Sequence, residues 1–137
     1  MKEYSQYITN CVDGDINCKD WCLPPEALKS QFKSIELPKE FSRRDLTPEV
    51  RDQGSIGSCV GFSGATVLGD TPEYEKMILS PMWIYKKAKE YDEWQGSNYS
   101  GTSISGACQA LRKEGACIEK YWPYVDSETS YPLPEAY

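Results

Sequence analysis

The stretch Gln53-Gly54-Ser55-Ile56-Gly57-Ser58-Cys59-Val60-Gly61-Phe62-Ser63 places a cysteine where a glycine-containing loop gives way to small and apolar residues. Gly54 and Gly57 allow backbone angles that other residues avoid, so the loop can turn tightly before Cys59. The run over 60–69 carries no charge and predicts a buried helix with close neighbours. A thiol in the first turn of such a helix faces unpaired backbone N–H groups and the positive end of the helix dipole, which favour the thiolate.

Several motifs around this stretch occur in the order that is typical of one enzyme family. They are the segments 37–45, 47–54, Gly57-Ser58-Cys59, Leu79-Ser80-Pro81-Met82-Trp83-Ile84-Tyr85, Ser100-Gly101-Thr102-Ser103-Ile104 and 115–124, which ends in Trp122-Pro123-Tyr124. Together they resemble the mature N-terminal part of papain-like cysteine peptidases, and the later motifs are similar to those of bacterial and phage-type members. The resemblance implies an α+β papain-like fold, of which this chain supplies mainly the helical left lobe, with a central buried helix starting at Cys59.

The resemblance also implies roles for four residues. Cys59 corresponds to the nucleophile, and Gln53 to the side-chain donor that joins the Cys59 backbone N–H in the oxyanion hole. Ser100 and Gly101 correspond to the point where the family lines its cleft with glycine beside the substrate backbone. The competing interpretations are a small apolar cysteine at the start of a buried helix, a plain loop glutamine and a turn glycine before a helix.

The base that this nucleophile needs is missing from the chain. None of the 137 residues is a histidine, whereas papain-like enzymes carry the partner histidine and asparagine about 130 to 150 residues after the cysteine. Ile56 and Val60 also depart from the family's C-G-[SA]-C-[WY] signature. We therefore expect half of a cysteine peptidase, inactive alone and completed by a right lobe in the rest of the chain or in a second polypeptide. The alternative is a non-catalytic half-domain that binds a peptide or inhibits a peptidase.

Three regions are expected along the chain. They are an N-terminal extension over 1–36, the left lobe over 37–125 and a linker over 126–137 toward the missing right lobe. The extension fits either a short pro-segment or a structural arm, and it contains a predicted short helix over 24–32. Its three cysteines, Cys11, Cys18 and Cys22, lack the close pairing and the histidine of structural zinc sites, so no metal is predicted. The resemblance implies no cofactor.

Start and stop signals predict three helices in the lobe. The first runs from Cys59 to about Leu68. The second has Ser80 as N-cap and Pro81 at its first position. The third starts near Thr102 or Ser103 and ends at Gly115, a natural left-handed cap.

Spacing predicts which faces of these helices are buried. On the second helix we expect an apolar face of Met82, Tyr85 and Ala88, with Lys86, Lys87, Lys89 and Glu90 toward solvent. On the third we expect an apolar face of Ile104, Ala107, Cys108 and Leu111.

Charge and composition restrict the classes of partner that we expect this chain to bind. With 21 acidic against 15 basic residues, the chain offers no basic patch for nucleic acid, and its apolar runs are too short to span a membrane. The first residues lack the apolar core of a signal peptide, which favours a cytoplasmic location. The resemblance to bacterial and phage-type members implies a phage- or bacterium-encoded protein. The partners that the resemblance implies are a peptide or protein substrate and the right lobe.

Overall fold

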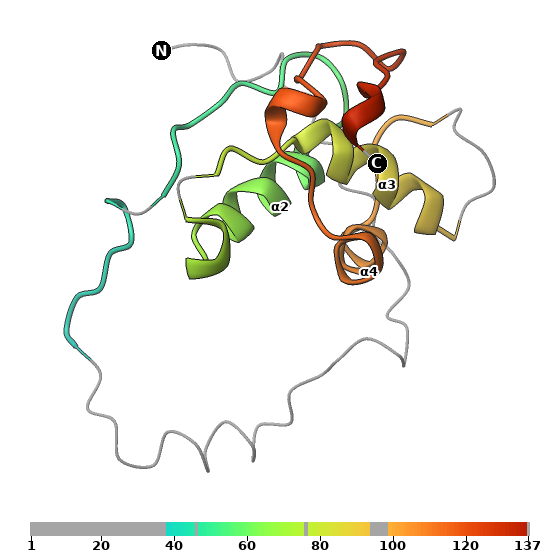
Figure 1. Ribbon diagram of the computed structural model, residues 1–137. Helices are drawn as coiled ribbons and strands as arrows, with labels where there is room; N and C mark the ends of the chain where they lie inside the picture. Colours follow the sequence, from blue (N-terminus) through green and yellow to red (C-terminus); the bar gives the residue numbers. More distant parts are fainter. Residues whose placement is uncertain (1–37, 46, 76, 94–98, 137) are drawn as a thin grey trace, which may run out of the picture.

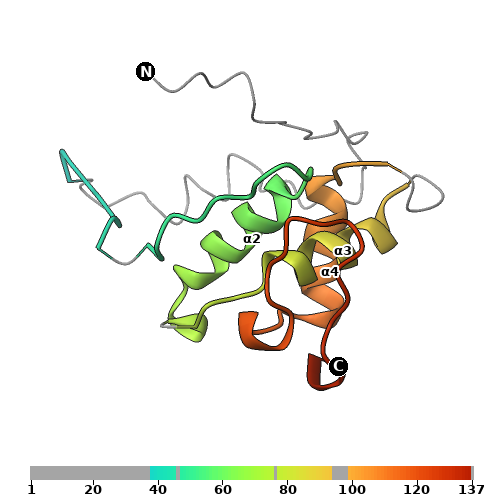
Figure 2. The same ribbon diagram turned by 90° about the horizontal axis from the view of Figure 1, so that it is seen from above.

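Three helices with loops folded across them form the described part of the chain, residues 38–45, 47–75, 77–93 and 99–136 (Figures 1 and 2). In this computed structural model the helices are α2 (Cys59–Gly69), α3 (Pro81–Tyr91) and α4 (Ile104–Glu114). Short 3-10 helices follow as η2 (Pro72–Tyr74), η3 (Glu119–Tyr121) and η4 (Pro134–Ala136). The predicted extension, including its three cysteines and the helix over 24–32, lies outside the described residues.

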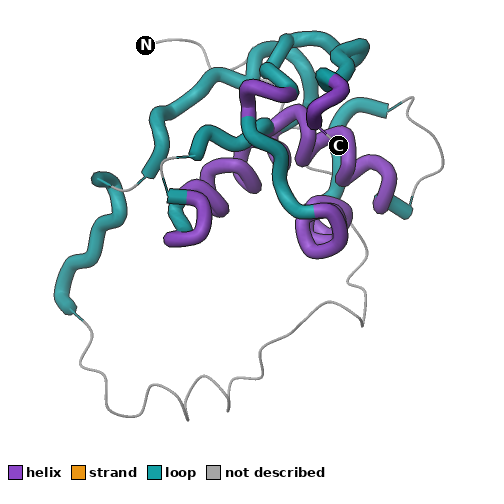
Figure 3. Tube along the Cα trace, viewed as in Figure 1, coloured by secondary structure: helices purple, strands orange, loops and turns teal. Residues whose placement is uncertain are grey.

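Helices and loops account for nearly all of the described residues, as Figure 3 shows by colour. An isolated antiparallel bridge joins Leu79 before α3 to Ile118 after α4. Ser80 N–H donates to Cys117 O across 2.8 Å, and Glu119 N–H donates to Ile78 O across 2.8 Å, so the two segments lie side by side. This pairing closes the lobe by joining the start of α3 to the segment that follows α4.

The predicted helix boundaries are confirmed. α2 begins at Cys59, and α3 begins at Pro81 after the N-cap Ser80. The Ser103 hydroxyl caps α4 by accepting from the Gly106 N–H, and Gly115 ends that helix. Gly115 has φ +79° and ψ −156°, so it uses the positive φ that glycine permits without the ψ of a left-handed helix.

Helix α3 packs against both α2 and α4 and supplies more core residues than either of them. Its largest fully buried side chains are Met82, Ile84 and Tyr85. Gly61 of α2 lies so close to α3 that an added Cβ would stand 2.3 Å from Pro81 O. This close approach explains why α2 is rich in small residues.

The predicted burial of Met82, Tyr85 and Ala88 on α3 is confirmed, but each of the two predicted helix faces is wrong in part. Lys89 is buried, because it lies one turn after Tyr85 and its ammonium group stacks over the rings of Tyr85 (5.0 Å) and Tyr99 (4.5 Å). Ile104 and Cys108 are exposed, the former by 63%. The buried face of α4 consists of small residues that allow a close approach to α3: Gly106, Ala107 and Ala110.

The N-cap of α3 combines two buried hydrogen bonds. Ser80 is fully buried, and its hydroxyl accepts from Trp83 N–H (3.1 Å) and donates to Trp122 O (2.7 Å). We expect Ser80→Ala to lower the free energy of unfolding by about 2 to 3 kcal/mol, because it removes the cap and leaves a buried carbonyl unpaired. Urea denaturation followed by tryptophan fluorescence measures this loss.

Ser63→Ala on the exposed side of α2 is the matched control, with an expected change within about 0.5 kcal/mol. An equally small change for Ser80→Ala would show that this cap does not stabilise the fold.

Candidate functional site

Cys59 is the first residue of α2 and is partly buried. The N-cap before it, Ser58, is fully buried, but its side chain makes no capping bond to the helix. The Ser58 hydroxyl instead lies 3.1 Å from the Tyr124 hydroxyl. The thiol is therefore placed at the helix start while the N-cap side chain is used elsewhere.

The loop before Cys59 carries Gln53 and turns through Gly54, which has φ +65°. The Gln53 side-chain amide donates to Ile56 O across 3.3 Å, and the Gln53 backbone carbonyl accepts from the Tyr124 hydroxyl. Because that hydroxyl gives its proton to Gln53 O, the Ser58 hydroxyl donates to Tyr124. Tyr124 thus contacts this loop both before and after the turn at Gly54.

Ser100 and Gly101 meet the loop immediately before the cysteine. The Ser100 hydroxyl accepts from Gly57 N–H across 3.2 Å, and a Cβ added to Gly57 would stand 2.6 Å from Gly101 N. Gly101 has φ +96°, a backbone conformation that favours glycine. The structure therefore brings Ser100 and Gly101 to the loop of Gln53 and Cys59, and the roles of all four stay predictions.

A buried polar network lies behind Gly101. The Tyr85 hydroxyl accepts from Gly101 N–H (3.2 Å) and from Lys89 Nζ (3.3 Å), and it donates to Glu128 Oε1 (2.6 Å). Burial, followed by the bond to Glu128, raises the pKa of Tyr85. The pKa of Lys89 is lowered by burial, against the pull of the Glu128 charge. This network fixes the backbone of Gly101 from α3.

Glu128 belongs to the segment predicted as a linker. Its carboxylate also accepts from Lys86 Nζ across 2.9 Å. Burial would raise the pKa of Glu128, but bonds from Tyr85 and Lys86 and the charges of Lys89 and Lys86 outweigh burial and lower it. Residues around 128 therefore fold back onto α3.

Asp92, the residue after α3, fixes the other end of this region. Its carboxylate accepts from Tyr99 OH (2.9 Å), Thr102 Oγ1 (2.6 Å) and the backbone and hydroxyl of Ser103. Burial and Asp92 together raise the pKa of Tyr99 to about 12. The bonds to Asp92 place the chain on both sides of Gly101.

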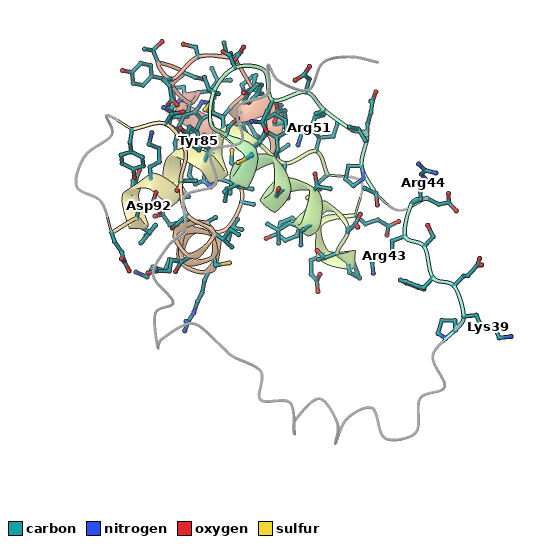
Figure 4. All side chains as sticks on the ribbon, turned by 180° about the vertical axis from the view of Figure 1, so that it is seen from behind. Lys39, Arg43, Arg44, Arg51, Tyr85 and Asp92 are labelled. Carbon is teal, nitrogen blue, oxygen red and sulfur yellow. The ribbon has the colours of Figure 1, made fainter. Side chains whose placement is uncertain are left out.

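An ion pair orients the chain that leads into the loop (Figure 4 labels Arg51, Tyr85 and Asp92). Arg51 binds Glu119 across 3.2 Å and donates to Leu79 O across 3.2 Å. Its guanidinium also lies 5.3 Å from the centroid of the Phe62 ring. These contacts tie the chain before Gln53 to the bridge between Leu79 and Ile118.

Neither a metal site nor a membrane-spanning helix is found in the described residues. No group of three or more His, Cys, Asp or Glu side chains in this part of the chain is arranged to bind a metal ion. None of the described helices has the length and apolar character needed to cross a membrane.

Sequence reasoning missed most residues that support the site. The Tyr124 ring stacks edge-on against Phe62 at 4.7 Å, but the position of its hydroxyl carries no sequence signal. Tyr85 was assigned to the apolar face of α3, and the bonds of Asp92, Asp126 and Glu128 were not anticipated. Each of these bonds joins residues that are far apart in the chain or depends on a loop.

The solved structures to which the chain is similar include a cysteine protease. The chain is similar to xylellain, a cysteine protease from Xylella fastidiosa, with 33% sequence identity and a TM-score of 0.51, over 66% of this chain and 37% of that chain. It is also similar to a structure from the mite allergens Blo t 1 and Der p 1, with 25% identity and a TM-score of 0.58, over 74% of this chain and 35% of that chain.

These proteins are papain-like, so the predicted fold, a mainly helical left lobe of the papain-like type, is confirmed. The chain spans little more than a third of the length of either neighbour, with 37% and 35% covered. No protein-family model and no curated protein sequence matches it.

The Tyr124 hydroxyl gives a test of how the loop is supported. Tyr124→Phe keeps the ring against Phe62 but leaves Gln53 O and Ser58 without their shared partner. We expect a loss of about 1 to 2 kcal/mol in the free energy of unfolding, measured by urea denaturation. The control is Tyr131→Phe, whose side chain is 84% exposed and which should change stability by less than about 0.5 kcal/mol. Equal effects of the two variants would contradict this support.

Glu128 makes stability depend on pH. Since its pKa is lowered in the folded state, its stabilisation is complete above the unfolded pKa of about 4.3 and is lost as pH falls through the folded value. We expect Glu128→Gln to destabilise at pH 7, with the difference from the parent chain shrinking below about pH 4.3. Urea denaturation at several pH values measures this, with the exposed Glu93→Gln as control. A difference that does not change with pH would contradict it.

Proposed function

We propose that this papain-like lobe is the nucleophile-bearing half of a cysteine peptidase, with Cys59 as the attacking thiolate. The observation that carries the proposal is the position of Cys59 as the first residue of α2, reached through a loop that contacts Ser100 and Gly101. Free N–H groups at a helix start favour negative charge on nearby groups. The likeness to cysteine proteases over 66% and 74% of the chain supports the same assignment.

In the proposed reaction the thiolate sulfur forms a bond to the peptide carbonyl carbon, and the carbonyl electrons move onto its oxygen. The Cys59 backbone N–H and the Gln53 side-chain amide donate to this oxyanion, and losing one such donor typically costs about 100-fold to 1000-fold in rate. Gln53 donates to Ile56 O in the structure, so its amide is already fixed within the loop. Substrate backbone lies beside Ser100 and Gly101 in this proposal.

Completion of the reaction needs a proton for the departing amine. No histidine occurs among the 137 residues, and proton transfer by a positioned acid contributes typically about 100-fold to 10,000-fold. We therefore propose that a right lobe, in the rest of the protein or in a second polypeptide, supplies the histidine. Coverage of only 37% and 35% of the neighbouring chains is consistent with such a second lobe.

In this proposal the right lobe also covers apolar surface that is exposed on the described lobe. The residues of α2 are apolar or small along its length, and not all of them are buried. Val67 on α2 is 67% exposed, and Val50 before it is 95% exposed. Apolar surface of this kind is typical of an interface. The domain proposal follows from it: a lobe over 37–125, followed by a segment over 126–137 that leads toward the right lobe after contacting α3.

Reaction with an activated ester tests the nucleophile without the missing acid. We expect a peptidyl p-nitrophenyl ester to acylate Cys59 once per chain, because nitrophenolate departs without protonation. The corresponding peptidyl p-nitroanilide should not turn over, because its amine needs an acid. A burst of nitrophenol, with peptide mapping of the acylated cysteine, measures the first result.

Two comparisons make the outcome specific. Cys59→Ser should remove the burst, and Cys59 should react faster than Cys108 although Cys108 is the exposed thiol. If Cys59 reacts more slowly than Cys108, the chain is better explained as a non-catalytic half-domain that binds peptides or inhibits a peptidase. Cys59-dependent turnover of the nitroanilide would refute the need for a base outside this chain.

A further inference from the structure

Asp126 binds the loop that carries both proposed oxyanion donors. Its carboxylate oxygen Oδ1 accepts from Ser55 N–H across 2.8 Å and from Ile56 N–H across 3.2 Å. The Ser55 hydroxyl lies 3.0 Å from Oδ1 and 3.1 Å from Oδ2. One side chain, 70 residues further along the chain, therefore binds two consecutive backbone amides of the loop.

The turn at Gly54 is shaped around this carboxylate. A Cβ added to Gly54 would stand 2.5 Å from Asp126 Cγ and 2.5 Å from its Oδ2, closer than real Cβ contacts allow. The φ of +65° at Gly54 also disfavours any side chain there. Glycine at this position therefore serves both the turn and the approach of Asp126.

The bound residues lie between Gln53 and Cys59 in the chain. Ile56 donates its N–H to the Asp126 carboxylate and accepts at its carbonyl from the Gln53 amide, so the two contacts share one residue. A shift of the 54–56 backbone would move the Gln53 side chain relative to the start of α2. Catalytic groups lose much of their effect when they are displaced by about 1 Å.

We propose that Asp126 is a positioning residue for the oxyanion hole, acting on Gln53 through the backbone of Ser55 and Ile56. This inference rests on the proposed function of Gln53 and Cys59. It also gives the segment over 126–137 a structural task within the lobe, beside that of a connection.

The charge state of Asp126 provides the first readout. The bond from Ser55 N–H lowers the pKa of Asp126, against burial, and the Ser55 hydroxyl and Ile56 N–H lower it further. Asp52 and Glu128 are the other carboxylates near the Tyr124 hydroxyl, and Asp52 accepts from Gly54 N–H across 2.8 Å. We expect the amide proton resonances of Ser55 and Ile56 to shift as Asp126 titrates. In Asp126→Asn this shift should disappear.

The second readout separates positioning from general support. A peptide aldehyde adds the Cys59 thiol across its carbonyl: the S–C bond forms, the carbonyl π bond breaks and the thiol proton goes to the oxygen, which the oxyanion donors then bind. We expect Asp126→Ala to weaken aldehyde binding on the order of tenfold, Asp126→Asn to retain part of it, and iodoacetamide alkylation of Cys59 to change less than about twofold. The matched control is Glu75→Ala, an exposed carboxylate on η2's C-terminal side.

The outcomes distinguish the two proposals. Loss of aldehyde binding in Asp126→Ala, with alkylation unchanged, supports the positioning role. Unchanged aldehyde binding, or equal loss in both reactions, overturns it and leaves the proposed function standing. If the parent chain and Cys59→Ser bind the aldehyde equally, the proposed function fails, and the inference about Asp126 fails with it, whatever the amide shifts show.

Discussion

The hydroxyl group of Tyr124 is the contact on which the geometry of the loop before Cys59 depends. It donates to Gln53 O and accepts from the Ser58 hydroxyl, across chain separations of 71 and 66 residues. Ordering a loop costs roughly 1 to 2 kcal/mol of backbone entropy per residue, so a glycine-containing turn needs fixed partners. Tyr124 meets this need at both ends of the turn, since it binds the residue before Gly54 and the N-cap of α2.

Tyr124 begins a short segment that contacts both sides of the candidate site. Two residues later Asp126 binds the amides of Ser55 and Ile56, and Glu128 then binds the Tyr85 hydroxyl, which accepts from Gly101 N–H. The loop with Gln53 and the segment with Gly101 are thus supported by neighbouring residues of one segment. Displacing the segment that carries Tyr124, Asp126 and Glu128 would move both the loop with Gln53 and the segment with Gly101. The spacing between these two therefore depends on a few hydrogen bonds.

Local signals accounted for what the sequence predicted well. These signals are Ser80 followed by Pro81, Ser103 before α4 and Gly115 after it. Each acts within one helical turn, so its interpretation does not depend on the rest of the fold. The failures concern long-range choices. Ile104 and Cys108 fit an apolar stripe by spacing, but the helix turns its small residues toward α3 because they permit a closer approach.

Polar residues were harder to predict, because their burial also depends on long-range contacts. Lys89 carries a charge that ordinarily lies in solvent. Its burial is made favourable by the rings of Tyr85 and Tyr99, by hydrogen bonds to Tyr85 OH and Tyr99 O, and by the nearby Glu128. The segment over 126–137 shows no periodic pattern, so sequence alone suggested a connection. Its role in the lobe comes from single side chains that reach partners on other elements, which periodicity does not detect.

The proposed function asks two different things of its active site. A helix start favours an anion by about 0.3 to 1 kcal/mol, and up to about 2 kcal/mol in good geometry. In the proposed reaction that free energy would favour the thiolate and the oxyanion, but it would give no proton to a departing amine. Groups that bind charge and groups that transfer protons therefore have separate physical requirements: the first need fixed N–H donors, which a rigid loop provides, and the second need a side chain that titrates near neutral pH. Under the proposed function the first kind of group lies in this lobe and the second kind is supplied by the right lobe, so the active site is divided between two structural units.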